Sequence, residues 1–268
     1  MENIIRRITF LIALVLSITG AVFAEDTEEE LAKKLSNPVA NLISVPFQYN
    51  YDKDIGPNDD GHKSLLNIQP VWPFSLNADW NLITRTIIPV VDQYDIPVKS
   101  EHDSGLGDIL QSFFFSPKEP VGGWILGAGP VLLYPSATDS MLGGEKWGVG
   151  PTVVALQQVN GWTYGILANH VESFAGKDDR AYISSTYLQP FLTYTTKTKT
   201  TFGLNTESTY DWHNSAWSVP INFTVAQMFK IGKFPLQLGA GIRYWVESPE
   251  NGPEGFGARL VLTFLFPK

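Results

Sequence analysis

The sequence predicts an all-β fold: a closed antiparallel transmembrane β-barrel of about 12 strands, with a short N-terminal helical leader. Segments of about ten residues alternate apolar and polar side chains from residue 41 onward, as barrel strands do. The chain also holds 8 Trp, 10 Tyr and 16 Phe, many of which flank these segments. Beyond the first residues, no apolar run reaches the length of about 20 residues that a spanning helix needs. A closed barrel is the other structure that satisfies every backbone group in lipid.

The first residues predict export. Arg6 and Arg7 precede an apolar run, and small residues from Gly20 to Ala24 follow it. This order is typical of a secretory signal peptide, so we expect residues 1–24 to be cleaved. The chain has no Cys, which leaves neither disulfides nor thiolate chemistry. Together these features predict a Gram-negative outer-membrane location.

Residues 25–40 predict a short helix before the barrel. Thr27 and Glu30 have the spacing of a capping box, and Asn37-Pro38 ends the helix. We interpret this segment as a periplasmic helical leader. A plug of the lumen is the alternative, because other barrels close themselves with a helix or a loop.

From residue 41 to residue 268 the sequence predicts the barrel itself. Short and mostly longer connections alternate between the strands, as expected when both termini are periplasmic and the longer loops lie outside. Periodicity alone would also allow a soluble β-sandwich. The predicted strands are 41–51, 65–75, 78–91, 105–116, 122–134, 146–158, 161–172, 181–195, 199–209, 217–230, 234–247 and 255–266.

Four prolines fall inside predicted strands: Pro70, Pro130, Pro190 and Pro220. Proline has no N–H to donate to a ladder and is normally confined to edges or bulges. A closed barrel has no edges, so we expect a bulge at each position.

The charge pattern excludes one class of partner. The net charge is −8, and nucleic-acid binding needs a basic face. The predicted outer loops are acidic, with Asp52, Asp59, Asp92 and Glu101 among their residues, whereas the predicted periplasmic turns are basic. An acidic mouth concentrates cations. Solvation together with divalent-ion bridging to lipid phosphates explains the acidic loops equally well.

Strand parity places a limited polar set on the inner face. Since an unpaired buried charge is costly, we expect the arginines to pair with carboxylates, and Arg243 and Arg259 to share one sector of the wall with Glu207 and Glu247 nearby. The set either packs into a network that fills a narrow barrel or forms a constriction that selects solutes. Its members are Gln48, Asn67, Gln69, Arg85, Asn205, Glu207, Asn222, Gln237, Arg243, Glu247 and Arg259, with Asp108 on a strand that alternates poorly.

Catalytic and metal-binding patterns are weak. A barrel hydrolase would need a Ser and a His in contact on the lipid-facing rim. His170 and Ser173 lie near the end of one strand, but the neighbouring Asn169 faces the opposite side from His170. The Asp59-Asp60 loop lacks the spaced ligands of an EF-hand. We therefore expect no enzymatic activity, metal or other cofactor.

Several motifs resemble one family of bacterial envelope proteins. The most specific is the stretch from Leu35 to Gln48, and Asn67-Ile68-Gln69-Pro70, Gly105-Leu106-Gly107-Asp108 and Trp162-Thr163-Tyr164-Gly165 accompany it. Over nearly the whole mature chain the sequence resembles the MetA-pathway of phenol degradation family, whose members are often labelled transporters. The resemblance implies an outer-membrane barrel that takes up small solutes, including aromatic or hydrophobic compounds, and it supplies no catalytic residues.

These observations predict a passive channel or transporter for small solutes. The expected partners are outer-membrane lipid and lipopolysaccharide, the barrel assembly machinery and a small-molecule solute. A structural or adhesive barrel with partner-binding loops and a lipid-modifying hydrolase remain as alternatives. Barrels of about eight strands are just filled by side chains, and those of about 16–18 hold a water channel, so the width of the lumen discriminates between transport and structure.

Overall fold

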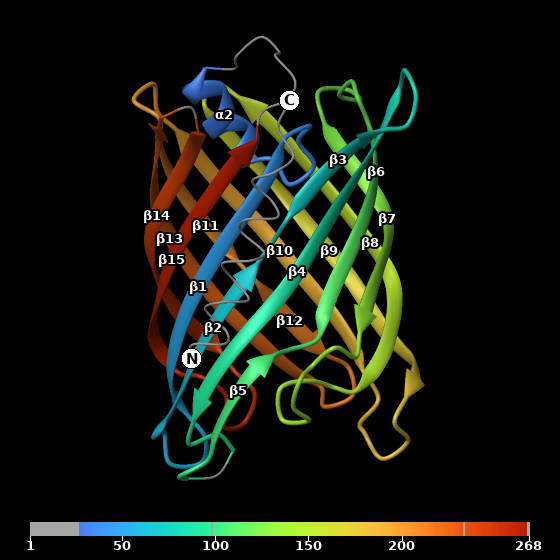
Figure 1. The fold of residues 1–268 in the computed structure, drawn as a ribbon, viewed down its shortest axis with the longest axis vertical. Helices are drawn as coiled ribbons and strands as arrows, with labels where there is room; N and C mark the ends of the chain where they lie inside the picture. Colours follow the sequence, from blue (N-terminus) through green and yellow to red (C-terminus); the bar gives the residue numbers. More distant parts are fainter. Residues whose placement is uncertain (1–26, 98, 233, 267–268) are drawn as a thin grey trace.

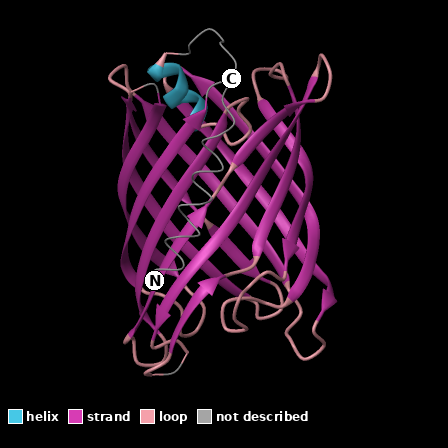
Figure 2. Cartoon of the chain, viewed as in Figure 1, coloured by secondary structure: helices cyan, strands magenta, loops and turns pink. Residues whose placement is uncertain are grey.

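The computed structural model describes residues 27–97, 99–232 and 234–266, so the predicted signal peptide lies outside the described residues. These residues form one helix and an antiparallel sheet (Figures 1 and 2). The helix α2 spans Glu28–Leu35, and none of the described helices is long and apolar enough to cross a membrane. The strands are β1 Ile43–Ile55, β2 Gly61–Ile68, β3 Val71–Ser75, β4 Trp80–Tyr94, β5 His102–Leu106, β6 Ile109–Pro117, β7 Ile125–Tyr134, β8 Lys146–Val159, β9 Trp162–Gly176, β10 Ser184–Thr195, β11 Thr200–Thr206, β12 Ser208–Asp211, β13 Ala216–Ile231, β14 Phe234–Glu247 and β15 Gly255–Phe266.

The sheet is closed. β15 pairs with β1, β9 pairs with β10, and every other pairing is between strands that follow one another around the wall. Three pairs of strands continue one another along the wall: β2 with β3 between β1 and β4, β11 with β12 between β10 and β13, and β5 with β6 along β4. The predicted closed antiparallel barrel of 12 strands with one short N-terminal helix is therefore confirmed.

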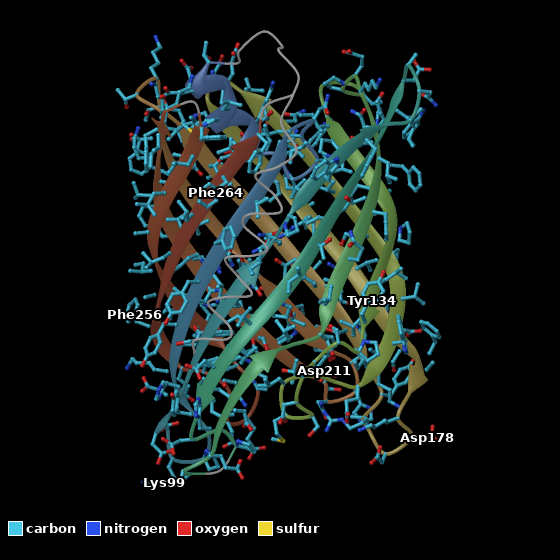
Figure 3. All side chains as sticks on the ribbon, viewed as in Figure 1. Lys99, Tyr134, Asp178, Asp211, Phe256 and Phe264 are labelled. Atoms are coloured by element: carbon cyan, nitrogen blue, oxygen red, sulfur yellow. The ribbon has the colours of Figure 1, made fainter. Side chains whose placement is uncertain are left out.

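The two ends of the barrel differ. Short connections such as 76–79, 160–161 and 196–199 lie at the end that holds α2, which we call the helix end. Mostly longer connections lie at the opposite end, the long-loop end, where Lys99 and Asp178 are seen in Figure 3. This separation is the one that the alternating connection lengths predict.

The outer face is apolar with aromatic residues near both ends. Leu260 and Phe223 are examples of outward side chains that are exposed in the isolated chain. Trp80 and Trp162 begin strands at the helix end, and Phe256 lies near the long-loop end. An apolar band between two aromatic girdles is the outer surface of a barrel that spans a membrane.

The prediction of bulges is correct for Pro220 alone. The register of β13 against β14 shifts between Val219 and Pro220. Pro70 lies in the break between β2 and β3, and Pro130 and Pro190 keep a regular register with β8 and β9, so the bulges predicted at these positions are wrong.

Pro130 and Pro190 interrupt the ladder on one side instead. Beside Pro130 the pairing of β6 with β7 is missing between Ser112–Val131 and Phe115–Ala128. At Pro190 the partner of β10 changes from β11 to β12. Since proline cannot donate a hydrogen bond, the strand loses the pairing on the side where its N–H would point and stays regular on the other.

Candidate functional site: the barrel lumen

The helix α2 lies in the mouth of the barrel at the helix end. The predicted capping box is present: the Glu30 amide donates to Thr27 Oγ1 over 3.3 Å, and the Thr27 amide donates to Glu30 Oε2 over 2.8 Å. On the surface of the helix, a hydrogen bond and an ion pair with Lys33 hold the pKa of Glu29 below its usual value. On the inner side, Leu31 and Ala32 are buried in a cluster with Met228 of β13 and Leu265 of β15.

The chain after the helix enters the lumen. The Asn37 side chain accepts a 2.9 Å hydrogen bond from the Val39 amide, and Val39 packs into an apolar cluster on the wall. The helix also touches other parts of the wall, since Gln158 Nε2 donates to the Lys33 carbonyl over 2.8 Å and Lys199 pairs with Glu28. Residues 27–42, which we call the plug segment, thus contact the wall on several sides.

One part of the inner wall is apolar. The five side chains of this apolar wall lie on β4, β6, β8 and β9, and each is at most 3 % exposed. Val39 of the plug segment packs against them. The predicted small and polar inner face is wrong here, because these side chains pack against one another, against Val39 and against Tyr187 and Phe191 of β10. The apolar wall consists of Ile83, Phe114, Val154, Leu156 and Leu167.

The opposite part of the wall carries a buried ion pair. Arg259 of β15, only 2 % exposed, donates from both terminal nitrogens to Glu207, over 2.9 Å to Oε1 and 2.6 Å to Oε2. Its Nε donates to Asn50 Oδ1 over 2.7 Å. The guanidinium is therefore held by a bidentate pair and an amide, a geometry that fixes its orientation.

Strand breaks and glycines make this pair possible. Glu207 lies between β11 and β12, at the interruption that Pro190 of β10 and Pro220 of β13 flank. On β14, which separates Arg259 from β13, the residue paired with Arg259 is Gly241. Without a side chain at that position, the arginine can reach a carboxylate that lies beyond β14 and β13.

A second charged cluster lies nearer the long-loop end. Arg243 Nε is 3.2 Å from Asp52 Oδ1, and the guanidinium lies 4.7 Å from the centroid of the Trp245 ring. Trp245 Nε1 donates to the same carboxylate oxygen over 2.8 Å. Arg243 Nε makes an ion pair with Asp52 but no hydrogen bond among the described residues. Lys63 of β2 lies opposite Asp52 in the strand pairing of β1 with β2.

Two carboxylates differ from their predicted surroundings. Glu247 is exposed at the end of β14, and the partner of Arg243 is Asp52, which the sequence assigned to an outer loop. The sequence missed Asp52 because the predicted first strand stops at residue 51, whereas β1 continues to Ile55. Continuing the alternation of Gln48 and Asn50 by one step would have found it.

Asp108 anchors a loop rather than joining the arginines. Its carboxylate accepts hydrogen bonds from the amides of Ala137, over 3.1 Å, and Gly144, over 2.6 Å. The same loop, residues 135–145, is held by Arg180 through the carbonyls of Ser140 and Gly143. At its end, a hydrogen bond to Glu145 raises the pKa of Lys177. Asp108 therefore shapes the long-loop end of the lumen.

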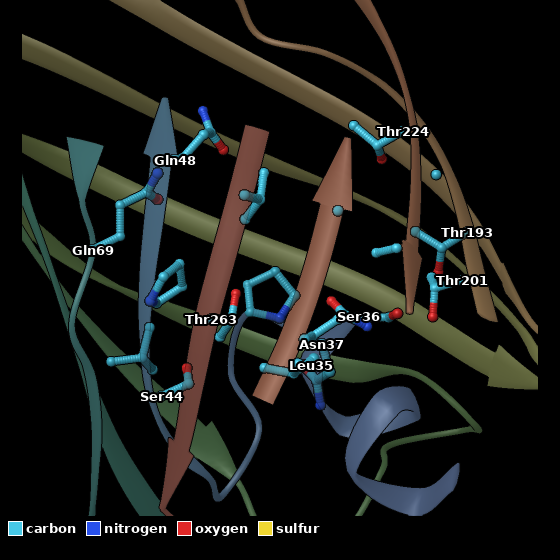
Figure 4. A pocket seen from close by; sticks show the side chains of 18 of the residues that line it. Leu35, Ser36, Asn37, Ser44, Gln48, Gln69, Thr193, Thr201, Thr224 and Thr263 are labelled. Carbon is cyan, nitrogen blue, oxygen red and sulfur yellow. The ribbon is translucent and has the colours of Figure 1, made fainter. Parts of the chain in front are cut away.

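Between the plug segment and the Arg259 pair lies a cavity of about 270 Å³ (Figure 4). Its lining is mixed, with apolar side chains such as Leu42 and Val261 beside polar ones. Among the polar ones, Arg85 donates to Gln69 Oε1 over 2.6 Å, and Thr193, Thr201, Thr224 and Thr263 contribute hydroxyls. The predicted inner residues Gln48, Gln69, Arg85, Asn205, Gln237 and Arg259 all line it, together with Asn37 and Gln189. Asn222 lies behind them and donates to Asn205 over 2.9 Å.

The candidate hydrolase residues are not assembled. Ser173 Oγ accepts a hydrogen bond from the Ile183 amide over 2.9 Å. The Ser173 and Asn169 side chains face inward, whereas the His170 side chain faces outward. His170 Nδ1 lies 2.8 Å from the hydroxyl of Thr186, which also accepts from Trp212 Nε1. The Ser–His contact that the sequence would require of a hydrolase is absent from this part of the described wall.

The fold is similar to solved outer-membrane proteins. The COG4313 outer membrane channel from Pseudomonas putida F1 superposes with a TM-score of 0.64 at 17 % identity, covering 84 % of this chain and 96 % of that one. The NanC porin gives a TM-score of 0.51 at 10 % identity, covering 83 % and 98 %. Outer membrane phospholipase A from Escherichia coli gives 0.50 at 10 %, covering 83 % and 90 %.

Comparison with protein-family models and with curated proteins finds no match. The similarity to solved structures is thus one of fold, shared by channels and by a phospholipase. The chain has the architecture of an outer-membrane β-barrel.

Proposed function

We propose that this protein is a passive outer-membrane channel for small solutes, of the MetA-pathway family that its motifs resemble, and that its plug segment controls passage. The observation that carries the proposal is a cavity with polar side chains in its lining inside a closed barrel, directly behind a segment that occupies the mouth. If the inner side chains served only to fill the lumen, we would expect no cavity of this size between them. The similarity to the fold of known channels supports the same function.

The plug segment is attached mainly by side chains. Leu31 and Ala32 pack on Met228 and Leu265, Glu28 pairs with Lys199, and Val39 packs on the apolar wall. It contributes no strand to the sheet. Because its release would leave the hydrogen bonds of the barrel intact, a solute pathway can open without unfolding the wall.

The apolar wall favours a second class of solute. Val39 covers this wall together with Tyr187 and Phe191 of β10, so its departure would leave a space lined by apolar side chains. A hydrophobic or aromatic compound, as the family resemblance implies, would regain the apolar contacts that Val39 makes now. Inhibition of polar-solute flux by an added apolar compound would support this second function.

A purely structural or adhesive role makes a different prediction for the plug segment. If the lumen has no transport role, releasing the segment changes stability but creates little flux. Planar-bilayer conductance of the mature protein separates the two roles.

The test uses Ala32→Asp, which places a carboxylate in the cluster with Met228 and Leu265. We expect conductance to rise, because the charged side chain cannot remain in an apolar contact. Glu29→Gln is the matched control, since it changes a charged residue on the solvent side of the same helix. Conductance that is equally low in the wild type and Ala32→Asp, both with the gel mobility of folded barrels, would contradict the proposal.

A further inference from the structure

The lining of the cavity has positive charge and no carboxylate. Lys34, Arg85 and Arg259 contribute cationic side chains, and no Asp or Glu occurs among the described residues that line it. The charge of Arg259 is neutralised by Glu207, which lies behind the lining. The cavity therefore differs from the acidic outer loops and would repel a cationic solute.

Arg85 differs from the other two inward arginines. Arg259 and Arg243 each have a carboxylate partner, whereas Arg85 donates to the neutral amide of Gln69, and no described carboxylate lies within 4 Å of it. The Arg85 side chain is only partly buried and borders the cavity. A guanidinium held on one side by an amide keeps donors free for a planar anion.

The rest of the lining suits hydroxyl groups. Gln48, Gln189 and Asn205 offer both donors and acceptors, and the threonines offer hydroxyls. Two lining atoms, Gln237 Nε2 and Thr193 Oγ1, have no hydrogen-bond partner among the described residues. Both atoms are covered by their neighbours, so the other amides and hydroxyls of the lining would meet the hydroxyls of a ligand.

We infer that the cavity is a binding site for a small hydroxylated organic carboxylate, with Arg85 as the residue that receives the carboxylate. The amides and threonines receive the hydroxyls of the ligand. This inference names the solute class of the proposed channel and so rests on the proposed function. A small aldonate or hydroxy acid has the required chemistry and fits a volume of about 270 Å³.

The direct test is calorimetric binding to the purified full-length mature protein in detergent, with D-gluconate as the probe and sorbitol as its neutral counterpart. The two compounds differ by a carboxylate in place of a hydroxymethyl group. We expect gluconate to bind and sorbitol to bind at least about tenfold more weakly, since hydrogen bonds to charged groups are the stronger ones. Hexanoate, which has the carboxylate and lacks the hydroxyls, should also bind more weakly than gluconate.

Two variants locate the site. Arg85→Gln should weaken gluconate binding by about tenfold or more, and Arg85→Lys should restore part of it. Lys63→Gln is the matched control, because it removes an inward positive charge outside the cavity lining and should leave binding unchanged. Absence of gluconate binding, equal binding of gluconate and sorbitol, or equal losses in Arg85→Gln and Lys63→Gln would overturn the inference.

Conductance separates this inference from the proposed function. If gluconate binds through Arg85 and no variant conducts, the carboxylate-binding site is supported and the channel function is contradicted. If the protein conducts and Arg85→Gln changes neither gluconate binding nor the preference for anions, the channel stands and the carboxylate site fails.

Discussion

The apolar wall and the polar wall of the lumen share one backbone geometry and differ in what covers them. On β4, β6, β8 and β9, Ile83, Phe114 and Leu156 are buried beneath Val39 of the plug segment. On the strands around β15, Arg259 and Arg243 are buried through their own ion pairs. Strand register determines which side chains face inward. The contacts that bury those side chains determine whether a wall can be apolar or charged.

This difference has a consequence for stability. The apolar wall depends on packing and in part on a segment that is not part of the sheet, whereas Arg259 and Arg243 of the polar wall find their carboxylate partners within the wall itself. Release of the plug segment should therefore open the apolar wall, while the ion pairs of Arg259 and Arg243 stay in place.

The largest effect is expected on the apolar wall. Phe114→Ala should lower the free energy of unfolding by about 3–5 kcal/mol, because it leaves a cavity at a fully buried site. Phe115→Ala is the matched control: Phe115 is the next residue of β6, faces outward and is 45 % exposed. Urea unfolding in lipid vesicles measures both, and equal losses would show that the inner wall is not packed.

A smaller effect should distinguish the outer face from the lumen on β15. Leu260→Arg places a charge toward lipid and should cost about 2–4 kcal/mol if the site lies near the membrane midplane. Val261→Thr, one residue further and on the cavity side, should cost less than about 1 kcal/mol, since threonines already line the same cavity. Folding yield in vesicles reports both changes. An equal penalty at the two positions would contradict the assignment of faces.

The smallest of the three effects is expected on the polar wall. Glu207→Gln keeps the shape but loses the charge that holds Arg259, so stability should fall by about 1.5–3 kcal/mol. Replacing both partners, as Glu207→Leu with Arg259→Met, should recover much of the loss, because neither charge is then left unpaired. A double variant less stable than Glu207→Gln would indicate that the pair is needed for the fold.

The alternation of the sequence predicted the barrel and most inward residues, because the period of two is a property of every strand. It also identified Arg259 and Glu207 as neighbours. It missed Asp52 as the partner of Arg243, because β1 extends beyond the predicted strand end at residue 51. It also left Asn50 out of the polar set, although Asn50 lies within the predicted strand. Val39 could not be placed from periodicity, since its contacts join strands distant in sequence.

The prolines show the same limit. Pro130 and Pro190 were expected to form bulges, yet each keeps the register on one side and interrupts pairing on the other. A single sequence shows that an N–H is missing, but it does not show toward which neighbouring strand that N–H would point.

The most direct test of the account is to lock the plug segment in place. The chain has no Cys, so Glu28→Cys with Lys199→Cys would introduce the only two thiols, at positions where the plug segment and the wall form an ion pair. A short bismaleimide should then join helix to wall, and planar-bilayer conductance is recorded before and after the reaction. The account predicts that crosslinking abolishes conductance in the double variant and has no effect on either single variant. Unchanged conductance in the crosslinked protein would contradict control of passage by the plug segment.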